Sequence, residues 1–324
     1  MTVDAQILSA LRFAGNRCVS GAELSDQLGI SRAAVWARIE ELRTLGYEIE
    51  ASPHQGYKLS VLPDVLHADD LLSLVAANRV VGRNIQVFQE TSSTNDVAEH
   101  LAGDGVAEGA VVFAETQKKG RGRLGRKWIS PAAKGLWFSV LLRPNLRPQE
   151  ATQVTVLAAT ALARALRQHG IAQPAIKWPN DILVRDRKLA GVLTELAAEI
   201  DRVRYVILGI GVNVNLAEFP AELRGTATSL RIETGHAVRR AELAASILRE
   251  LDFDYDRLGR GQFPRIAEEW AAQCTTLGRR VSIRVGDRSV RGCAESLDDS
   301  GALLLRTDHG HLERIIGGDV TLEK

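Results

Sequence analysis

The chain has 324 residues, of which 45% are hydrophobic and 25% charged, as is ordinary for a globular protein of two or three domains. Its formal net charge of +1 excludes a molecule-wide basic field, so binding to nucleic acid would need a local patch. The N-terminus lacks a signal-peptide core, and no run of about 18 apolar residues occurs, so we expect a cytoplasmic protein without a membrane segment. Cys18, Cys274 and Cys293 lack metal-ligand spacing, so we predict buried thiols and no metal site.

Residues 1–62 are predicted to form a winged helix-turn-helix domain. A first helix with one apolar face precedes a second helix that Ser20 can cap, and Ser31 can cap a third helix after a tight glycine turn. Residues 47–60 then read as two short strands around a turn at residues 53–56, which would make the wing. Helix, tight turn and helix is the arrangement with which many proteins read DNA.

The third helix of this domain holds the candidate DNA contacts, because the first turn of such a helix approaches base edges. Trp36, on the same helix, is expected to pack in the core. Residues 1–62 contain six Lys/Arg and seven Asp/Glu, so one copy should bind DNA weakly and a dimer on two half-sites is predicted. A helix-turn-helix that contacts only proteins is the alternative. The predicted DNA-binding residues are Ser31, Arg32, Ala33 and Arg38.

The rest of the chain predicts an α+β fold in two further parts. Residues 66–272 mix helices and strands, and the short polar connections between the strands indicate antiparallel hairpins, hence a mixed α/β domain on an antiparallel-rich sheet. Residues 275–324 read as short strands between Gly and Asp turns, which fits a small SH3-like β-barrel. The central part is expected to contain helices at 150–169, 240–258 and 264–271, and strands at 111–115, 136–142, 182–184, 189–196 and 205–213.

Residues 117–128 (QKKGRGRLGRKW) form the most informative segment. They hold six cations, three glycines and no acid, which does not suit a surface helix because glycine is a poor helix former. Glycines let a backbone approach a ligand closely, and arginines supply forked donors for phosphate or carboxylate. We therefore predict a loop that wraps a polyanion and becomes ordered when the anion binds. A loop that binds RNA is the alternative.

Downstream, Lys177 lies in the sequence IKWPNDI, where the following Trp-Pro restricts the backbone. We interpret it as a held point charge for a developing negative charge rather than as a solubilising surface lysine. Gly191, Gly209 and Gly211 lie inside predicted strands, where glycine indicates a bulge or a close neighbour. Asn213 and Asn215 after them could bond a nucleotide or cap a turn.

The motifs Ser93-Thr94-Asn95, GRGRLGRKW, KWPND, KLAGVLTE and GIGVNVN, in this order, resemble those of biotin–[acetyl-CoA-carboxylase] ligases. With residues 1–60 in front, the chain is similar over essentially its whole length to the members of that family that are also biotin operon repressors. The resemblance implies that biotin and ATP are substrates, with Mg²⁺ on the phosphates, and that the partners are the biotin carboxyl carrier protein and operator DNA. It also implies a homodimer when the adenylate is bound.

By matching positions, the resemblance also implies roles for individual residues, with Arg123 and Lys177 as the catalytic pair. The residues implied for biotin are Ser93, Thr94, Asn95 and Gln117; those for the binding loop are Gly120, Arg121, Gly122 and Arg123; Lys177 would touch both the biotin carboxylate and the phosphate; and those for the nucleotide side are Trp128, Asn180 and Asn213.

This reading predicts how two anions could react. Arg121, Arg123 and Lys177 would screen the repulsion between a carboxylate and ATP, and no protein nucleophile is needed because the carboxylate attacks the α-phosphate itself. A lipoate or octanoate ligase of the same fold, a repressor that only senses a small anion, and a ligase whose helix-turn-helix has lost its operator remain alternatives.

Overall fold

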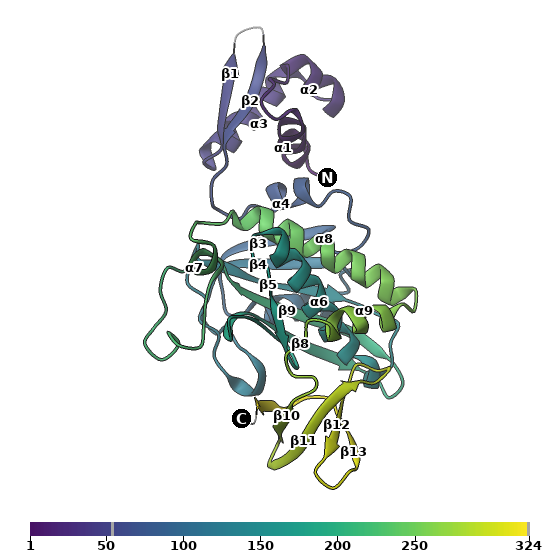
Figure 1. Ribbon diagram of the computed structural model, residues 1–324. Coiled ribbons are helices and arrows are strands. Elements are labelled where there is room, and N and C mark those ends of the chain that lie inside the picture. The colour runs from purple at the N-terminus through teal and green to yellow at the C-terminus, as the bar shows by residue number, and fades with distance from the viewer. Residues whose placement is uncertain (53–54, 323–324) are drawn as a thin grey trace.

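The chain folds into three parts that follow one another in sequence and in space. The computed structural model describes residues 1–52 and 55–322. A small helical unit lies at one end, a seven-stranded sheet with its helices fills the middle, and a five-stranded sheet lies at the opposite end (Figure 1). This order confirms the predicted fold class of helix-turn-helix, mixed central domain and C-terminal β domain.

The N-terminal unit has the predicted helices and wing. Its elements are α1 (Val3–Ala14), α2 (Gly21–Leu28), α3 (Arg32–Thr44) and the antiparallel pair β1 (Glu48–Ser52) and β2 (Gly56–Val61). Ser20 and Ser31 accept bonds from the backbone N–H of Glu23 and Ala34 and so cap α2 and α3, as expected. The helices and the wing share a core of their own, which includes Ile7, Leu24, Val35, Ile39 and Ile49.

Two expectations are wrong, one of them confined to this unit. Trp36 is 57% exposed instead of packing in the core, because the buried face of α3 consists of Val35, Ile39 and Leu42 alone. Cys18 in this unit, and Cys274 and Cys293 later in the chain, were expected to be buried but are half-buried free thiols. The predicted turn of the wing includes Pro53 and His54, which lie outside the described residues.

The central sheet has the strand order β3-β4-β5-β9-β8-β7-β6. The pair β3 and β4 is parallel, and all the other pairs of this sheet are antiparallel, so the hairpins predicted from short connections are confirmed. The strands are β3 (Asn84–Thr91), β4 (Ala110–Gln117), β5 (Gly135–Leu142), β6 (Ala175–Lys177), β7 (Asp181–Val184), β8 (Arg187–Ala198) and β9 (Val203–Asn213).

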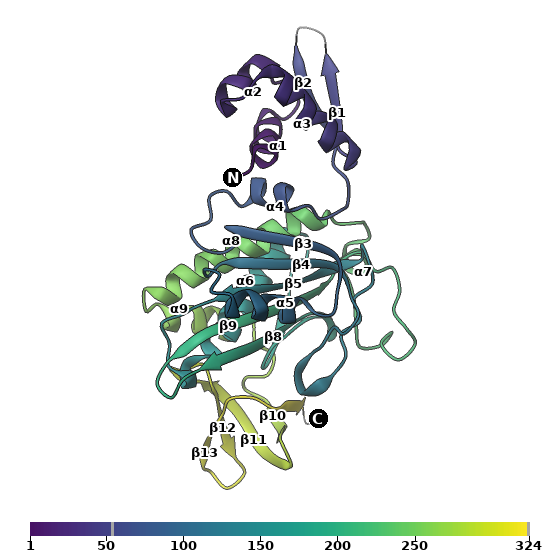
Figure 2. The ribbon, with the colours of Figure 1, turned by 180° about the vertical axis from the view of Figure 1, so that it is seen from behind.

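The two faces of this sheet are covered differently. One face packs against α6 (Thr152–Gln168), α8 (Arg240–Gly259) and α9 (Phe263–Ala271) and forms the main apolar core. The other face meets α5 (Thr94–Gly103) over only part of its area (Figure 2). The uncovered part lies where β4 leaves the sheet and where the basic loop begins. Of the helices in the described part of the chain, none combines the length and the apolar character needed to cross a membrane.

The C-terminal unit is a five-stranded antiparallel sheet with the order β13-β12-β11-β10-β14. Its inner residues, among them Val281, Ile283 and Leu305, join the core of the central domain, so the two units pack as one body. The closed SH3-like barrel stays a prediction. The strands are β10 (Arg280–Val285), β11 (Arg288–Leu297), β12 (Leu303–Thr307), β13 (Leu312–Ile315) and β14 (Asp319–Leu322).

A short helix, α4 (Ala68–Leu74), connects the N-terminal unit to the central sheet, and α1 lies directly against it (Figure 1). Arg12 of α1 donates to the carboxylate of Asp70, whose side chain is only 3% exposed. The rings of Tyr47 and His67 lie 5.9 Å apart at the same junction. A nearly buried ion pair and an aromatic contact therefore hold the N-terminal unit on the central one.

The Arg12→Ala variant tests this junction. It leaves the nearly buried Asp70 carboxylate without its cation, which should lower the free energy of unfolding by about 1–3 kcal/mol in a urea titration. The control Arg202→Ala removes an exposed partner of Glu199 and should leave the stability unchanged. Equal losses in the two variants would mean that the Arg12–Asp70 pair contributes no more than a surface contact.

Candidate active site

The uncovered part of the central sheet contains a short strip of glycines on β8 and β9. Gly211 on β9 lies between Gly191 on β8 and the buried Trp137 on β5, and Gly209 lies opposite Ser139 on β5. A Cβ atom on Gly209 would lie 2.3 Å from Oδ1 of Asn95, and one on Gly211 would lie 2.5 Å from Cε2 of Trp128. The close neighbours predicted for these glycines are therefore confirmed, and larger residues would exclude the side chains that form the site.

Ser93, Thr94 and Asn95 lie at the start of α5, above this strip, and each is at most 4% exposed. The backbone N–H of Thr94 donates to Oε1 of Gln117 over 2.8 Å, and Nε2 of Gln117 donates to Ser130 over 3.0 Å. The Ser139 hydroxyl lies 2.7 Å from Oγ1 of Thr94. The structure thus brings the four residues expected at the biotin into one polar corner, in which hydrogen bonds connect Thr94 with Gln117 and, through Ser139, Thr94 with Asn95.

Arg121, the first arginine of the loop, is held by two carboxylates. Its Nε and Nη2 donate to the two oxygens of Glu195, each over 2.9 Å, and Nη1 donates to Asp96. Asn95 donates to the same Glu195 over 2.6 Å. The bond to Glu195, helped by Asp96, raises the pKa of Arg121 despite the burial. These pairs tie the loop to elements that lie far from it in sequence, a set of contacts that repulsion among its cations does not predict. Ordering of the loop on ligand binding stays a prediction.

Arg123 differs, because its guanidinium is half-buried with little to neutralise it. Among the described residues, Nη1 has one long bond, of 3.4 Å, to Oδ1 of Asn180, and a Cβ on Gly317 would lie 3.0 Å from Nη2. Burial lowers the pKa of Arg123, against the opposing pull of Asp319 and Asp181. A half-buried cation with spare donors is a ready anion site. Arg126 donates to Asp319 and so ties the loop to the C-terminal sheet.

Trp128 closes the loop over the glycine strip. Its Nε1 is buried and has no hydrogen-bond partner in the part of the chain that the structure describes. The ammonium of Lys188 lies 5.2 Å from the centre of its ring and 2.6 Å from Oδ1 of Asp181. Lys188 is a site residue that the sequence reasoning missed, and the signal was its place in the KLAG motif, three residues before Gly191.

Lys177 lies farther out than Lys188, on the edge strand β6. It pairs with Asp181, which pairs with Gly191, which in turn pairs with Gly211. Residues in one cross-strand row share a face, so Lys177 is on the side of the sheet that faces the loop. Asp181 connects the two lysines, because it is the cross-strand partner of Lys177 and its Oδ1 lies 2.6 Å from the Lys188 ammonium.

The remaining predicted residues shape the edges of the site. A Cβ on Gly120 would lie 2.5 Å from the carbonyl oxygen of Trp128, and Gly122 donates its N–H to Arg126 over 2.7 Å, so both glycines serve the loop's tight path. Asn213 donates to the carbonyl of Thr228 over 3.0 Å. Asn215 exchanges two bonds of 2.9 Å with the backbone of Val238. Neither asparagine caps a local turn, because their partners lie 15 and 23 residues along the chain; they instead tie the end of β9 to the segment that follows it.

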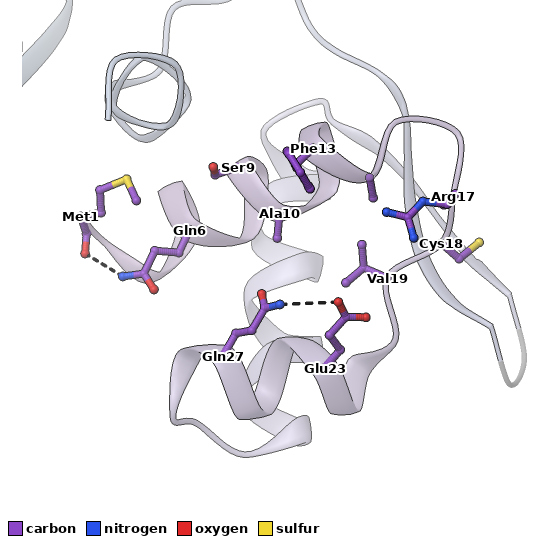
Figure 3. A pocket seen from close by; sticks show the side chains of 11 residues that line it. Met1, Gln6, Ser9, Ala10, Phe13, Arg17, Cys18, Val19, Glu23 and Gln27 are labelled. Carbon is purple, nitrogen blue, oxygen red and sulfur yellow. Dashed lines mark hydrogen bonds between the residues drawn. The ribbon is translucent and has the colours of Figure 1, made fainter. Parts of the chain in front are cut away.

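The candidate DNA contacts lie together at the start of α3. Ser31, Arg32 and Ala33 are exposed, whereas Arg38 pairs with Glu41 and lies 3.4 Å from Asp4. Arg32 is therefore the cation of this helix that is best placed for a phosphate or a base. The hollow of about 410 Å³ shown in Figure 3 lies elsewhere in this unit, between α1 and α2, and includes neither these residues nor the basic loop.

Comparison with known proteins gives the same assignment to all three parts. The model of the biotin/lipoate A/B protein ligase family matches residues 87–213, an HTH domain model matches residues 4–58, and the biotin protein ligase C terminal domain matches residues 276–322. The bifunctional ligase/repressor BirA of Bacillus subtilis (strain 168) is 38% identical over 99% of both chains. The protein of the same name from Escherichia coli (strain K12) is 30% identical over 99% of this chain and 97% of its own.

A solved structure shows the same architecture with ligands. The biotin protein ligase from Aquifex aeolicus in complex with biotin and ATP superposes with a TM-score of 0.64 at 31% identity, over 75% of this chain and 99% of its own.

The Gly211→Ala variant tests whether the loop rests on the glycine strip. The new Cβ would lie within 2.5 Å of the Trp128 indole, so the ring must leave and the loop must loosen. We expect trypsin to cleave within residues 118–127 several-fold faster than in the unchanged protein. Gly225→Ala is the control, because a Cβ there has no neighbour within 4 Å. Unchanged cleavage of the Gly211→Ala protein would contradict this packing.

Proposed function

Because this chain belongs to the biotin protein ligase family, in the form that joins a ligase and a repressor in one chain, we propose that it biotinylates a carrier protein and represses biotin synthesis genes. Biotin and ATP are its substrates, biotinyl-5'-AMP is the intermediate, and a lysine of the biotin carboxyl carrier protein is the acceptor. The observation that carries this proposal is the half-buried Arg123 on a basic loop above a strip of glycines.

The first step joins two anions. A carboxylate oxygen of biotin attacks the α-phosphorus of ATP, the bond to the bridging oxygen of the β-phosphate breaks, and pyrophosphate leaves. The protein's task is to bring the anions together and to screen their charge. Arg123 from the loop and Lys177 from the sheet would supply most of that screening, because Arg121 is already paired with Glu195 and Asp96 and Lys188 with Asp181. Arg121 would add to the screening and hold the loop in place.

The polar corner that contains Ser93, Thr94, Asn95 and Gln117 supports the assignment of biotin to the inner end of the strip. Buried hydroxyl and amide groups there can form hydrogen bonds with the polar ring of a ligand whose remaining surface is apolar. The roles proposed for Gly120 and Gly122 are to let the backbone approach the reacting groups. On the nucleotide side we place Trp128, Asn180 and Asn213.

In the second step the amine of the carrier lysine attacks the carbonyl carbon of the mixed anhydride. The bond from that carbon to the AMP oxygen breaks, an amide forms, and the amine loses its proton. Because water would also cleave the anhydride, the ordered loop protects the intermediate while the carrier approaches.

Mg²⁺ would enter with ATP. The described residues offer no group of three or more His, Cys, Asp or Glu side chains that could hold a metal, so phosphate oxygens would provide most of its ligands. Mg²⁺ supplies further screening of the β- and γ-phosphates when it is bound.

For repression we propose that residues 1–62 read operator DNA as part of a homodimer that forms when the adenylate is bound. The few cations of α3 support this, because one copy would bind weakly and two copies would add their contacts. Ligation is proposed for the unit of residues 66–272, with residues 275–324 as the C-terminal unit that receives Arg126.

The direct test is to mix the protein with ATP and Mg²⁺ and to measure pyrophosphate after adding biotin, lipoate or octanoate. We expect pyrophosphate release with biotin but not with lipoate or octanoate. When the carrier protein is then added, biotin should become attached to its lysine. Release with lipoate or octanoate would favour the related ligase activity, and binding of biotin without release would favour a sensor.

The Arg123→Ala variant should bind biotinyl-5'-AMP about ten- to hundredfold more weakly, because it loses charge-assisted bonds in a half-buried place. It should also release the intermediate into solution, which chromatography of the reaction mixture would detect. Arg147→Ala is the control, since Arg147 pairs with Glu150 on the surface. Tight retention of the adenylate by the Arg123→Ala protein would exclude this role.

The Arg32→Ala variant should weaken binding to the gene's own upstream DNA about tenfold or more in gel shifts with biotin and ATP. Arg38→Ala should weaken it less, because Arg38 is already paired with carboxylates. If the unchanged protein shifts no such DNA, the chain is a ligase whose helix-turn-helix has lost its operator.

A further inference from the structure

Behind the basic loop lies a buried ion pair that has no part in the reaction described above. Arg240, the first residue of α8, is 0% exposed, and Glu115 on β4 is 5% exposed. Nη1 and Nη2 of Arg240 donate to the two carboxylate oxygens of Glu115 over 2.6 and 3.1 Å. Burying such a pair is costly unless its remaining hydrogen-bonding groups are also satisfied.

The segment that connects the two units satisfies most of the remaining N–H groups of Arg240. The other N–H groups of Arg240 reach the backbone oxygen of Asp64 over 2.6 Å, the Asp64 carboxylate over 3.2 Å and the carbonyl of Gly135 over 3.3 Å. All five donors of the guanidinium are therefore used. Two of the bonds go to the connection between the wing and α4.

Glu115 completes the arrangement. It accepts the backbone N–H of Leu66 over 3.0 Å and that of Ala133 over 3.2 Å. Burial works to raise the pKa of Glu115, but the bonds from Arg240, Leu66 and Ala133 outweigh it and leave the pKa below its ordinary value. The carboxylate therefore stays ionised at neutral pH.

The positions of these partners along the chain show which segments the ion pair of Glu115 and Arg240 connects. Glu115 precedes Gln117 by two residues and so belongs to the outgoing stem of the basic loop, while Ala133 and Gly135 form the returning stem. Ala133 has a φ of 56°, a left-handed conformation that a non-glycine residue rarely adopts. One ion pair thus fixes both stems of the loop and the interdomain connection.

We propose that Glu115 and Arg240 are positioning residues that join the two stems of the ligand loop to the connection at residues 62–66, so that ligand binding stiffens the attachment of the DNA-reading unit. This cluster of Asp64, Glu115 and Arg240 is called the clasp below. The inference rests on the proposed function, because the ligand is the biotinyl-5'-AMP assigned to the loop.

Hydrogen exchange of the whole protein tests the clasp, because the Leu66 amide bonds directly to Glu115. Calorimetry first establishes that biotinyl-5'-AMP binds. Exchange of residues 62–74 should then slow about tenfold with ligand, within the usual range of coupling between sites. A protein that binds ligand without any slowing in this segment would overturn the clasp alone. A protein that binds no ligand would overturn the proposed function, and the clasp with it.

Variants separate positioning from simple stability. Glu115→Gln should still bind ligand but lose the slowing of exchange, and its KM for biotin should rise more than its kcat falls. Arg257→Lys is the matched control, since Arg257 is another buried arginine of α8, paired with Asp254 and Glu269. The Arg257→Lys protein should have a lower free energy of unfolding but should keep the ligand-dependent slowing of exchange in residues 62–74.

If Glu115→Gln does not fold, Asp64→Ala provides the same test, because the Asp64 side chain is 49% exposed and its loss leaves the buried pair in place. Asp64→Ala should at least halve the ligand-dependent slowing. If ligand slows the exchange of residues 62–74 as much in every clasp variant as in the unchanged protein, the coupling between the ligand loop and this segment does not pass through these residues.

Discussion

The arrangement of this site depends on how one short loop holds its positive charges close to the central sheet. Six cations in a dozen residues repel one another, and in isolation they would keep the loop extended and mobile. Carboxylates from other parts of the chain compensate some of this charge: Glu195 and Asp96 pair with Arg121, and Asp319 pairs with Arg126. Among the described residues, Lys119, Arg123 and Lys127 have no carboxylate at ion-pair distance, and of these three only Arg123 is not exposed. Arg123 is therefore the unpaired loop cation that we propose for the substrates.

The second constraint is space. Side chains of ordinary size on β8 and β9 would fill the volume that Trp128 and Asn95 occupy, so the strands carry glycine where these two residues touch them. Glycine weakens a strand, and here the cost is offset because the opposite face packs against three helices in the main core. One face of the sheet packs into the main core, and the glycines on the other face leave room for Asn95 and Trp128 beside the smaller core under α5.

The sequence predicted those features that arise from local pattern. Short polar connections indicated hairpins, and the hairpins are present; Ser31 was expected to cap a helix, and it does. Features set by register over long distances were not accessible. The pair between Arg121 and Glu195 joins residues 74 positions apart, and no spacing rule connects them. Lys188 was missed for a similar reason, because it reaches Trp128 only through the fold.

Trp36 shows the limit of helical periodicity. The period of α3 identifies the centre of its buried face, but not the width of that face, which depends on how closely α1 and the wing approach. Core packing was therefore an equally reasonable expectation, and it is wrong because only three residues of α3 are buried. An exposed aromatic residue beside Arg32 then belongs to the surface that would meet DNA.

The clasp indicates why two activities can share one chain. An apolar contact between residues 62–66 and the loop stems could shift by small steps. The Arg240 guanidinium, with all five donors engaged, has only one arrangement in which its hydrogen bonds are complete. Loss of one bond leaves a buried charge poorly compensated, so partial displacement is penalised more than it would be for hydrocarbon. Such an element has discrete states rather than a continuum, which is what transmission between distant sites requires. A short connection from the wing to α4, held at Asp64 and Leu66, leaves the DNA-reading unit little freedom that is independent of the loop.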